Sequence, residues 1–378
     1  MSETQRVLFL HLGTRKSGTS FLQEALLASA DALRAQGLGI PLGSRFEHFT
    51  QVFKPLSSVP DAGPVPAPAR KAMARLADRL RESSEPRLLL TLEDLAQLTP
   101  RQVAVLLEAL TDFDVHVVIT ARHWAKQIPS EWQQCVKERL KVGYPDYARS
   151  IRERDGSLDS EVFLARQHVP EIAARWGSSL PPGQVHVLPV PSYSADPGRL
   201  PELFCGILGV DPASLTAPGG LRNRSLGYEQ AETLRRVNVA LGDRLADFRK
   251  EYRYAVRKFI ARGSLLRQKG SSLVLPTELV PWCHEESAAQ AKELLDRGYD
   301  IVGDIDDLVS EDRVPHQEFR EVTDAELAQV AVTALADLAV LRHREIRAAE
   351  KAAATVPPVA PPAPAPSLLR RAVRRLRS

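Results

Sequence analysis

The sequence has few of the residues that hold small secreted proteins together. Its 378 residues include only three cysteines, Cys135, Cys205 and Cys283, which lie far apart and form no C-x-x-C pair. An odd number of cysteines without paired spacing argues against a disulfide framework and against a cysteine zinc site. We therefore expect three reduced thiols, as is usual for a protein of the cytoplasm.

Long apolar runs and an excess of one charge are also missing. No segment approaches the roughly 18 consecutive apolar residues of a membrane-spanning helix, and the polar start MSETQR does not resemble a signal peptide. Lysine and arginine number 50 against 47 acidic residues, a net charge of +3, so the charge balance gives no reason to expect nucleic-acid binding. These absences favour a cytoplasmic location.

Short apolar runs alternate with segments of helical spacing through the first half of the chain. Hydrophobic residues make up 44% of the sequence, which is enough for a sizeable core. Continuous short runs are typical of strands buried on both faces of a parallel sheet. The pattern predicts a three-layer α/β/α fold with a central, mainly parallel sheet. The predicted strands are 6–13, 86–95, 114–122 and 184–190, and the predicted helices are 20–36, 69–83, 100–110 and 160–176.

After about residue 195 the chain is predicted to be mostly helical. Segments 229–262 and 323–352 have helical, highly charged patterns, whereas 354–366 is proline and alanine and 367–378 is strongly basic. The basic tail could contact an anionic membrane surface or an acidic partner, or serve only as a solubilising tail. The expected units are an α/β domain of residues 1–320 with helical additions, a C-terminal helix of residues 321–353 packed on it, and a disordered linker and tail of residues 354–378.

A loop of residues 13–20, GTRKSGTS, joins the first predicted strand to the first predicted helix. Backbone N–H groups at the start of a helix converge on an anion, and the helix dipole adds to the attraction. The nucleoside-triphosphatase pattern needs lysine at the position of Thr19, but Lys16 comes two residues before Gly18 instead. The displaced lysine favours a shorter phosphate ligand without a compulsory metal.

The loop sequence TRKSGTSFLQ resembles the 5′-phosphosulfate-binding loop of sulfotransferases that use 3′-phosphoadenosine 5′-phosphosulfate, usually T-x-K-S-G-T-T-[WF]. In that family a strand ends in arginine, a serine follows eight residues later, and the two bind the 3′-phosphate. Arg122 and Ser130 have this spacing. The resemblance is good over about residues 6–135 and only loose, to bacterial members, beyond them. It implies a P-loop sulfotransferase fold.

The resemblance also implies roles for single residues. Lys16 would contact the oxygen that bridges sulfate and phosphate and stabilise charge on the departing phosphate. Phe21 would stack on adenine or belong to the helix core, and the side chain of Arg15 is expected to face solvent. Pro129 departs from the family and is expected to break the helix beside Ser130. The residues expected to form the donor site are Arg15, Lys16, Ser17, Gly18, Thr19, Ser20, Phe21, Arg122 and Ser130.

Sulfuryl transfer needs a base that takes the proton of the attacking hydroxyl. Glu93 is the preferred candidate, because it follows a strand that ends at the ligand edge of the sheet, although it could instead begin a helix. Glu47 and His48 are the rivals, at a spacing similar to that of the base in heparan-type enzymes. His11 lies beneath the loop and is expected to be structural.

The sequence therefore predicts an enzyme that moves a sulfuryl group from 3′-phosphoadenosine 5′-phosphosulfate to a hydroxyl or amine of a carbohydrate, lipid or natural-product acceptor. Adenosine 3′,5′-bisphosphate would be the product, and no metal is expected. A catalytically silent nucleotide-binding module and a kinase-like enzyme are the alternatives. The basic segment 248–270 would recognise an anionic acceptor, help to hold the 3′-phosphate, or form a solvated helix face.

Overall fold

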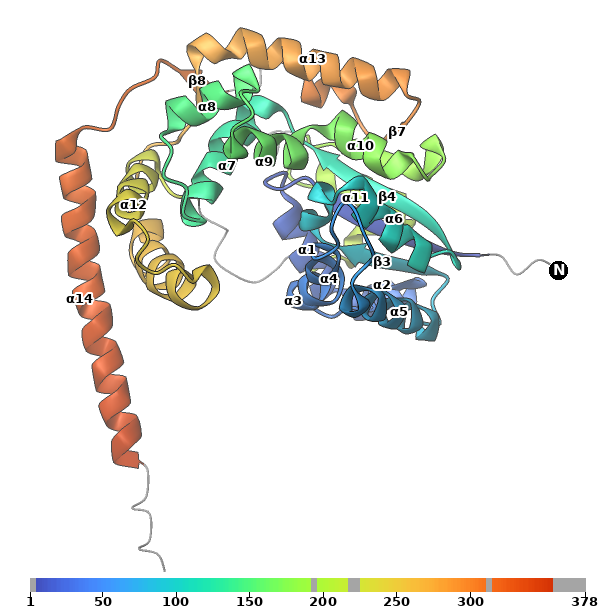
Figure 1. Cartoon of the computed structure of the whole chain (residues 1–378), viewed down its shortest axis with the longest axis horizontal. Coiled ribbons are helices and arrows are strands. Elements are labelled where there is room, and N and C mark those ends of the chain that lie inside the picture. The colour runs from blue at the N-terminus through green and yellow to red at the C-terminus, as the bar shows by residue number, and fades with distance from the viewer. Residues whose placement is uncertain (1–4, 192–195, 217–224, 311–314, 356–378) are drawn as a thin grey trace, which may run out of the picture.

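Six parallel strands form one sheet in the computed structural model, which describes residues 5–191, 196–216, 225–310 and 315–355 (Figure 1). The strand order is β2-β3-β1-β4-β5-β7, so β1 lies in the middle between β3 and β4. The predicted parallel α/β fold is confirmed. The strands are β1 (Arg6–Gly13), β2 (Leu38–Gly39), β3 (Arg87–Thr91), β4 (Phe113–Ala121), β5 (Val185–Pro189) and β7 (Asp300–Ile301).

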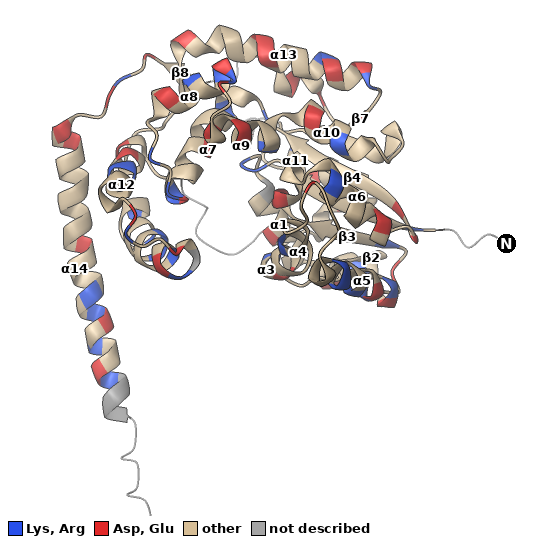
Figure 2. Ribbon diagram, viewed as in Figure 1, with Lys and Arg blue, Asp and Glu red and all other residues tan. Residues whose placement is uncertain are grey.

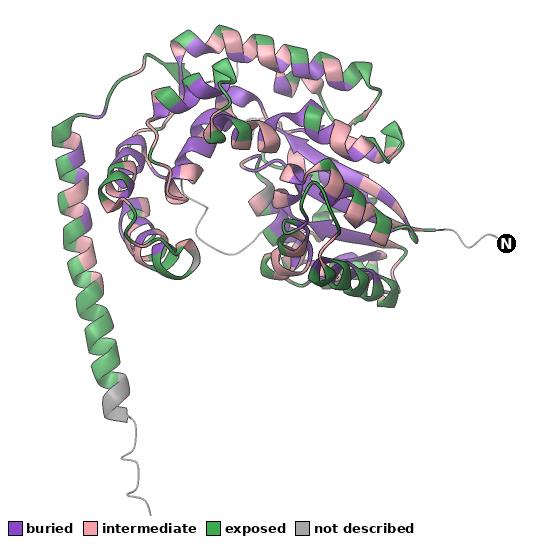
Figure 3. Ribbon diagram, in the orientation of Figure 1, coloured by how far each residue is buried: buried purple, intermediate pink, exposed green. Residues whose placement is uncertain are grey.

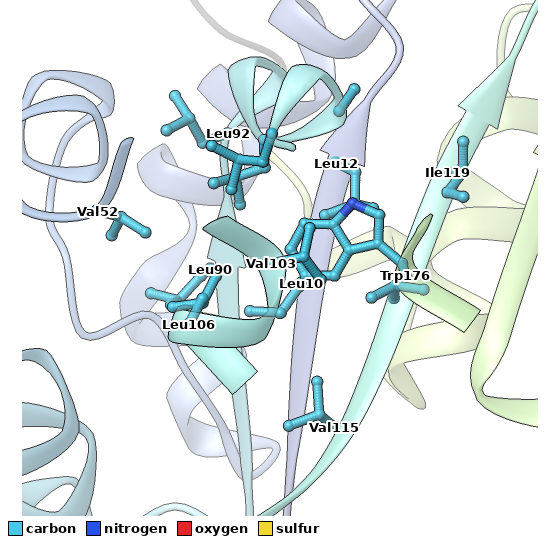
Figure 4. Close-up of a cluster of buried hydrophobic side chains, with 14 of the residues drawn as sticks. Leu10, Leu12, Val52, Leu90, Leu92, Val103, Leu106, Val115, Ile119 and Trp176 are labelled. Atoms are coloured by element: carbon cyan, nitrogen blue, oxygen red, sulfur yellow. The ribbon is translucent and has the colours of Figure 1, made fainter. Parts of the chain in front are cut away.

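Both faces of this sheet are covered, and β1 divides its side chains between them. Leu8, Leu10 and Leu12 are fully buried on one face, where Trp176 joins them in the cluster of Figure 4. Phe9 packs on the other face. The first face is covered by the helices α5 (Ala67–Glu82), α6 (Pro100–Ala109) and α10 (Val169–Gly177), together with the short elements α3 (Arg45–His48), η1 (Phe49–Phe53) and α4 (Lys54–Leu56). The second face is covered by α1 (Thr19–Ala28), α2 (Ala30–Ala35) and α11 (Arg199–Leu208).

A second hydrophobic core, beside the sheet in Figure 1, joins the remaining helices. Its large side chains include Trp132, Tyr144 and Tyr252, all fully buried. Trp132 donates a hydrogen bond from Nε1 to the carbonyl oxygen of Val142, 3.0 Å away. The elements are α7 (Trp124–Lys137), α8 (Tyr144–Glu153), α9 (Leu158–Gln167), α12 (Tyr228–Leu241), the π-helical η5 (Phe248–Ala261), α13 (Val280–Asp296) and α14 (Asp324–Thr355).

Short segments complete the chain. Strands β6 (Leu275–Pro276) and β8 (His316–Gln317) form a separate parallel pair. The single 3₁₀ turns are η2 (Glu93–Gln97), η3 (Pro182–Gln184), η4 (Pro212–Ser214), η6 (Leu265–Arg267), η7 (Thr277–Leu279) and η8 (Ile305–Leu308).

Three long helical predictions are each divided in the structure. The predicted helix 20–36 is interrupted at Ser29, which has φ −104° and ψ 13°. The predicted helix 160–176 is interrupted at His168, whose Nδ1 accepts a hydrogen bond from the Glu171 N–H and so begins α10. Segment 229–262 is interrupted after Gly242, which has a positive φ of 56°. Helical spacing alone continues across such breaks.

The first part of α14 packs on the rest of the described protein. Leu327, Val330 and Ala334 are buried in the second core and Asp337 accepts a hydrogen bond from Ser264 Oγ at 2.6 Å, whereas residues 342–351 are exposed (Figure 3). Residues 356–378, which hold most of the predicted linker and the basic tail, lie outside the described part of the chain. Among the described residues, no helix is both long and apolar enough to cross a membrane.

Leu10 gives a direct test of the central core. Leu10→Ala would remove fully buried methyl groups from the middle strand and is expected to lower the free energy of unfolding by about 2–5 kcal/mol. Urea unfolding measures the loss. Leu158→Ala is the control, because Leu158 is 77% exposed, and a similar loss in both variants would contradict this assignment of the core.

Candidate functional site

The predicted site residues lie where the carboxyl ends of β1, β3 and β4 meet. The loop 14–18 connects β1 to α1, Glu93 follows β3, and Arg122 follows β4. From β1 the strand order continues to β3 and β2 on one side and to β4, β5 and β7 on the other. Open parallel sheets bind ligands at the carboxyl ends of the strands beside such a change in strand order.

The loop is fixed to the neighbouring strand β4 by Thr120. The Thr14 N–H donates to the carbonyl oxygen of Thr120 at 2.7 Å. Ser17 is buried, and its Oγ donates to the Thr14 carbonyl oxygen at 2.6 Å and lies 2.7 Å from Thr120 Oγ1. The hydroxyl of Ser17 is therefore used inside the protein, and only its backbone N–H is available to a ligand.

Two buried glutamines hold the back of the loop. Gln127 Nε2 donates to the Arg15 carbonyl oxygen at 2.9 Å and contacts Thr14 Oγ1 at 3.2 Å. Gln167 Nε2 donates to the same carbonyl oxygen at 3.1 Å, and its own Oε1 accepts from Gln127 at 2.9 Å. These amides come from α7 and α9, so both helices set the shape of the loop.

The first turn of α1 presents backbone N–H groups without a capping side chain. Gly18 is the N-cap residue, with φ 85°, and it has no side chain to accept from the N–H groups that follow. Thr19 and Ser20 begin the helix. Uncapped N–H groups and the positive end of the helix dipole attract an anion.

Lys16 has a left-handed backbone, with φ 64°, and the residue is half-buried. Among the described residues, its ammonium has no hydrogen-bond or ion-pair partner. Burial lowers the pKa of Lys16, and the positive charges of Arg15 and Arg122 lower it further, while Glu131 and Glu93 oppose them. A half-buried cation without a partner is ready to receive an anion.

Arg122 brings the second predicted element against the loop. Its Nη1 donates to the carbonyl oxygen of Lys16 at 3.0 Å, and burial lowers its pKa. Ser130 lies on α7 and is partly exposed. The expectation that Pro129 breaks the helix was wrong: α7 is continuous from Trp124 to Lys137, because proline removes one backbone hydrogen bond that the packed helix can spare.

The expectation that Arg15 faces solvent was also wrong. Its side chain is 9% exposed, and its guanidinium pairs with Glu138 at 2.7 Å and with Glu131 at 3.4 Å. Burial disfavours its charge, but these carboxylates outweigh burial and raise the pKa of Arg15. The side chain therefore joins the loop to α7 and leaves no free guanidinium for a ligand.

Glu93 lies directly beside the end of β1. Gly13 has φ 93°, and a Cβ placed there would come within 2.9 Å of Glu93 Cβ and 3.0 Å of its Cα, so only glycine allows this approach. Arg45 pairs with Glu93 Oε1 at 3.3 Å and reaches Ser20 Oγ at 3.5 Å. Sequence patterns did not indicate Arg45, which comes from the short helix α3.

Of the other candidates for the base, the histidines are not accessible. His48 is fully buried, with Nδ1 2.9 Å from the Ser44 carbonyl oxygen, and burial lowers its pKa. His11 is also fully buried, 2.8 Å from Thr91 Oγ1, and burial lowers its pKa to about 3. Glu47 accepts the N–H of Gly43 at 2.7 Å. Of these carboxylates, Glu93 is the one that contacts the loop.

The remaining predictions concern Phe21, the thiols and metals. Phe21 is 42% exposed, so it does not belong to the core. Cys135, Cys205 and Cys283 are free thiols. Within residues 5–191, 196–216, 225–310 and 315–355, no three histidine, cysteine or acidic side chains are grouped so as to hold a metal ion.

Comparisons with known proteins gave one solved structure that we report. No family model and no curated protein matches the sequence. The crystal structure of a sulfotransferase from Alicyclobacillus acidocaldarius is similar with a TM-score of 0.40 and 16% sequence identity, over 65% of this chain and 100% of that chain.

Gly13 provides a test of the contact between the loop and Glu93. Gly13→Ala is expected to lower the free energy of unfolding by at least about 1 kcal/mol more than Gly63→Ala, because the new methyl group meets Glu93. Gly63 is a matched control: it has φ 87° and no other atom within 4 Å of an added Cβ. Urea unfolding compares the two variants, and equal losses would contradict the close approach of Glu93.

Proposed function

We propose that this protein is a sulfotransferase that moves a sulfuryl group from 3′-phosphoadenosine 5′-phosphosulfate to a hydroxyl or amine of a carbohydrate, lipid or natural-product acceptor. The observation that carries the proposal is the ammonium of Lys16, unpartnered among the described residues, at the uncapped start of α1, with Arg122 against the same loop. The loop sequence and the Arg122–Ser130 spacing, which resemble those of this family, specify the donor.

Each of the two anionic groups of the donor, the 5′-phosphosulfate and the 3′-phosphate, would be bound by a positively charged side chain of this site. The N–H groups of residues 17–20 and the ammonium of Lys16 would bind the 5′-phosphosulfate. Arg122, with a planar guanidinium suited to phosphate, and Ser130 would bind the 3′-phosphate. The exposed ring of Phe21 is available to stack on adenine.

Transfer requires a new bond from sulfur to the acceptor oxygen or nitrogen and cleavage of the bond from sulfur to the bridging oxygen. The electron pair of the broken bond goes to the 5′-phosphate, which leaves as adenosine 3′,5′-bisphosphate. Lys16 and the loop N–H groups would stabilise this charge. Glu93 would take the proton of the acceptor, in the position that Gly13 and Arg45 give it.

The position of the lysine speaks against a triphosphate enzyme. The position after Gly18 holds Thr19 and not the lysine that would reach the β- and γ-phosphates. A silent binding module keeps the same loop, so only a transfer assay separates it from the enzyme.

Binding of the donor product tests the loop. Adenosine 3′,5′-bisphosphate is expected to raise the midpoint of thermal unfolding, and ATP is not. Lys16→Met is expected to weaken bisphosphate binding about tenfold or more, through loss of one charged contact. The unliganded variant should unfold at no lower temperature, because a half-buried cation without a partner does not stabilise the fold.

Lys54→Met is the control for this experiment, since Lys54 is exposed on α4. Calorimetric titration gives the affinities. No binding of the bisphosphate at millimolar concentration would overturn the proposed function, and stabilisation by ATP alone would favour a kinase-like enzyme.

Glu93→Gln tests the base. Transfer of radiolabelled sulfuryl to a panel of sugars, lipids and phenols is expected to fall about 10²–10⁴-fold, with bisphosphate binding unchanged. Glu47→Gln is the matched control. A loss in Glu47→Gln but not in Glu93→Gln would assign the base to Glu47, and binding without any transfer by the wild-type protein would favour the silent module.

A further inference from the structure

The end of α7 and the basic segment η5 are fixed against each other. Tyr252 of η5 donates from its hydroxyl to Asn238 Oδ1 at 2.7 Å and contacts the Val136 carbonyl oxygen at 3.4 Å. Asn238 Nδ2 donates to the same carbonyl oxygen at 2.9 Å. The guanidinium of Arg139 lies over the Tyr252 ring, 5.8 Å from its centre. The position of η5 relative to α7 is therefore set by buried contacts.

This packing brings three cations together from three elements. Lys16 belongs to the loop, Lys137 to the last turn of α7, and Arg257 to η5. Burial lowers the pKa of Lys137 to about 7, with help from the positive charges of Lys16, Arg257 and Arg15 and against the carboxylate of Glu138. Burial also lowers the pKa of Arg257. Figure 2 shows Lys and Arg on both α7 and the segment that follows α12.

The cluster lacks matching negative charge. Glu138 is the carboxylate that acts on both Lys137 and Arg257, but Glu138 already accepts from Arg15 at 2.7 Å and from Gln134 at 2.6 Å. In the described part of the chain, neither Lys137 nor Arg257 has a side-chain hydrogen bond or ion pair. Arg257 lies over the ring of Phe248, 6.0 Å from its centre. Partly buried like charges repel, and a bound anion removes the repulsion.

Lys137 also lies away from Ser130, one of the two groups assigned to the donor 3′-phosphate. The two residues are seven positions apart on α7, a rise of about 10 Å along the helix. Under the proposed function, on which this inference rests, Lys16 and the loop bind one end of the donor and Arg122 and Ser130 bind the other. Lys137 and Arg257 then remain for a different anion.

We propose that Lys137 and Arg257 form an anion subsite beside Lys16, which binds a phosphate, sulfate or carboxylate group of the acceptor. The subsite selects acceptors that already carry a negative charge. It places that charge at the loop side of α7, next to the position of the sulfuryl group. The two side chains contact the acceptor and take no part in proton transfer.

Inorganic sulfate is the probe for the test, because it stays a dianion from pH 6 to pH 8.5. It is titrated by calorimetry into protein saturated with adenosine 3′,5′-bisphosphate, so that the donor site is filled. Sulfate is expected to bind, and Lys137→Met and Arg257→Gln are each expected to weaken it about tenfold. The affinity for sulfate should fall as the pH rises through 7 in the wild-type protein and stay level in Lys137→Met.

Lys250→Met and Arg149→Gln are the matched controls, since both side chains are exposed and neither belongs to the cluster. They should bind sulfate as the wild type does. All four variants should bind the bisphosphate with wild-type affinity. A loss of bisphosphate affinity in both Lys137→Met and Arg257→Gln would assign these side chains to the donor 3′-phosphate and overturn the proposal. The proposal would also be overturned if sulfate does not bind the wild-type protein, or if it binds both variants as tightly as the wild type.

Folding of the variants is checked by thermal unfolding at several pH values. The pKa of Lys137 is depressed in the folded protein, so the unfolded chain binds the extra proton between about pH 7 and pH 10.5 and wild-type stability rises with pH in that window. Lys137→Met should remove this rise and unfold at a higher temperature than the wild type near pH 6.

If the bisphosphate fails to bind the wild type, the proposed function fails and the titration is repeated on Lys16→Met. If Lys16→Met binds sulfate and the binding is lost on adding Lys137→Met, the anion subsite is supported without the donor. If Lys16→Met does not bind sulfate in this way, both the proposed function and the anion subsite are overturned.

Discussion

The attachment of the loop to β4 is the contact on which the candidate site depends. Thr120 accepts the Thr14 N–H on its carbonyl oxygen, and its side-chain hydroxyl donates to the Ser17 Oγ. Arg122 follows only two residues later, and its guanidinium meets the carbonyl oxygen of Lys16. The strand that holds the loop thus also leads into the arginine, so β4 sets the spacing between the two proposed anion-binding elements.

The distribution of carboxylates decides which of two adjacent cations is available. Arg15 and Lys16 are neighbours in the sequence, but Glu131 of α7 and Glu138, directly after α7, form ion pairs with Arg15 and none with Lys16. Glu131 is fully buried, where an unpaired carboxylate would be costly, so its pairing with Arg15 ties the loop to the helix. Lys16 has no such partner among the described residues, and its charge is left for a ligand.

The sequence predicted the parts of the fold that have a local signal. Four strands are continuous apolar runs, and the loop has a recognisable composition. Strands β2 and β7 have two residues each, too few for any pattern. The burial of Arg15 depends on carboxylates more than a hundred residues away, and Arg45 reaches Glu93 across 48 residues. Such contacts form only when the chain folds, and the spacing of residues along the sequence does not predict them.

Helix α7 connects the three tasks that this site would perform. Ser130, Gln134 and Lys137 follow one another at helical spacing, so they lie on one face of the helix. Ser130 and Glu131 lie in the middle of the helix, where Glu131 pairs with Arg15 of the loop. Lys137 is its last residue and feels the positive charge of Arg257. The proposed donor contacts come from the sheet edge, whereas Arg257 comes from η5, an element that joins α7 through Tyr252. Under the two proposals, substitutions in η5 would therefore change which acceptor charge is bound while the donor contacts at the sheet edge stay in place.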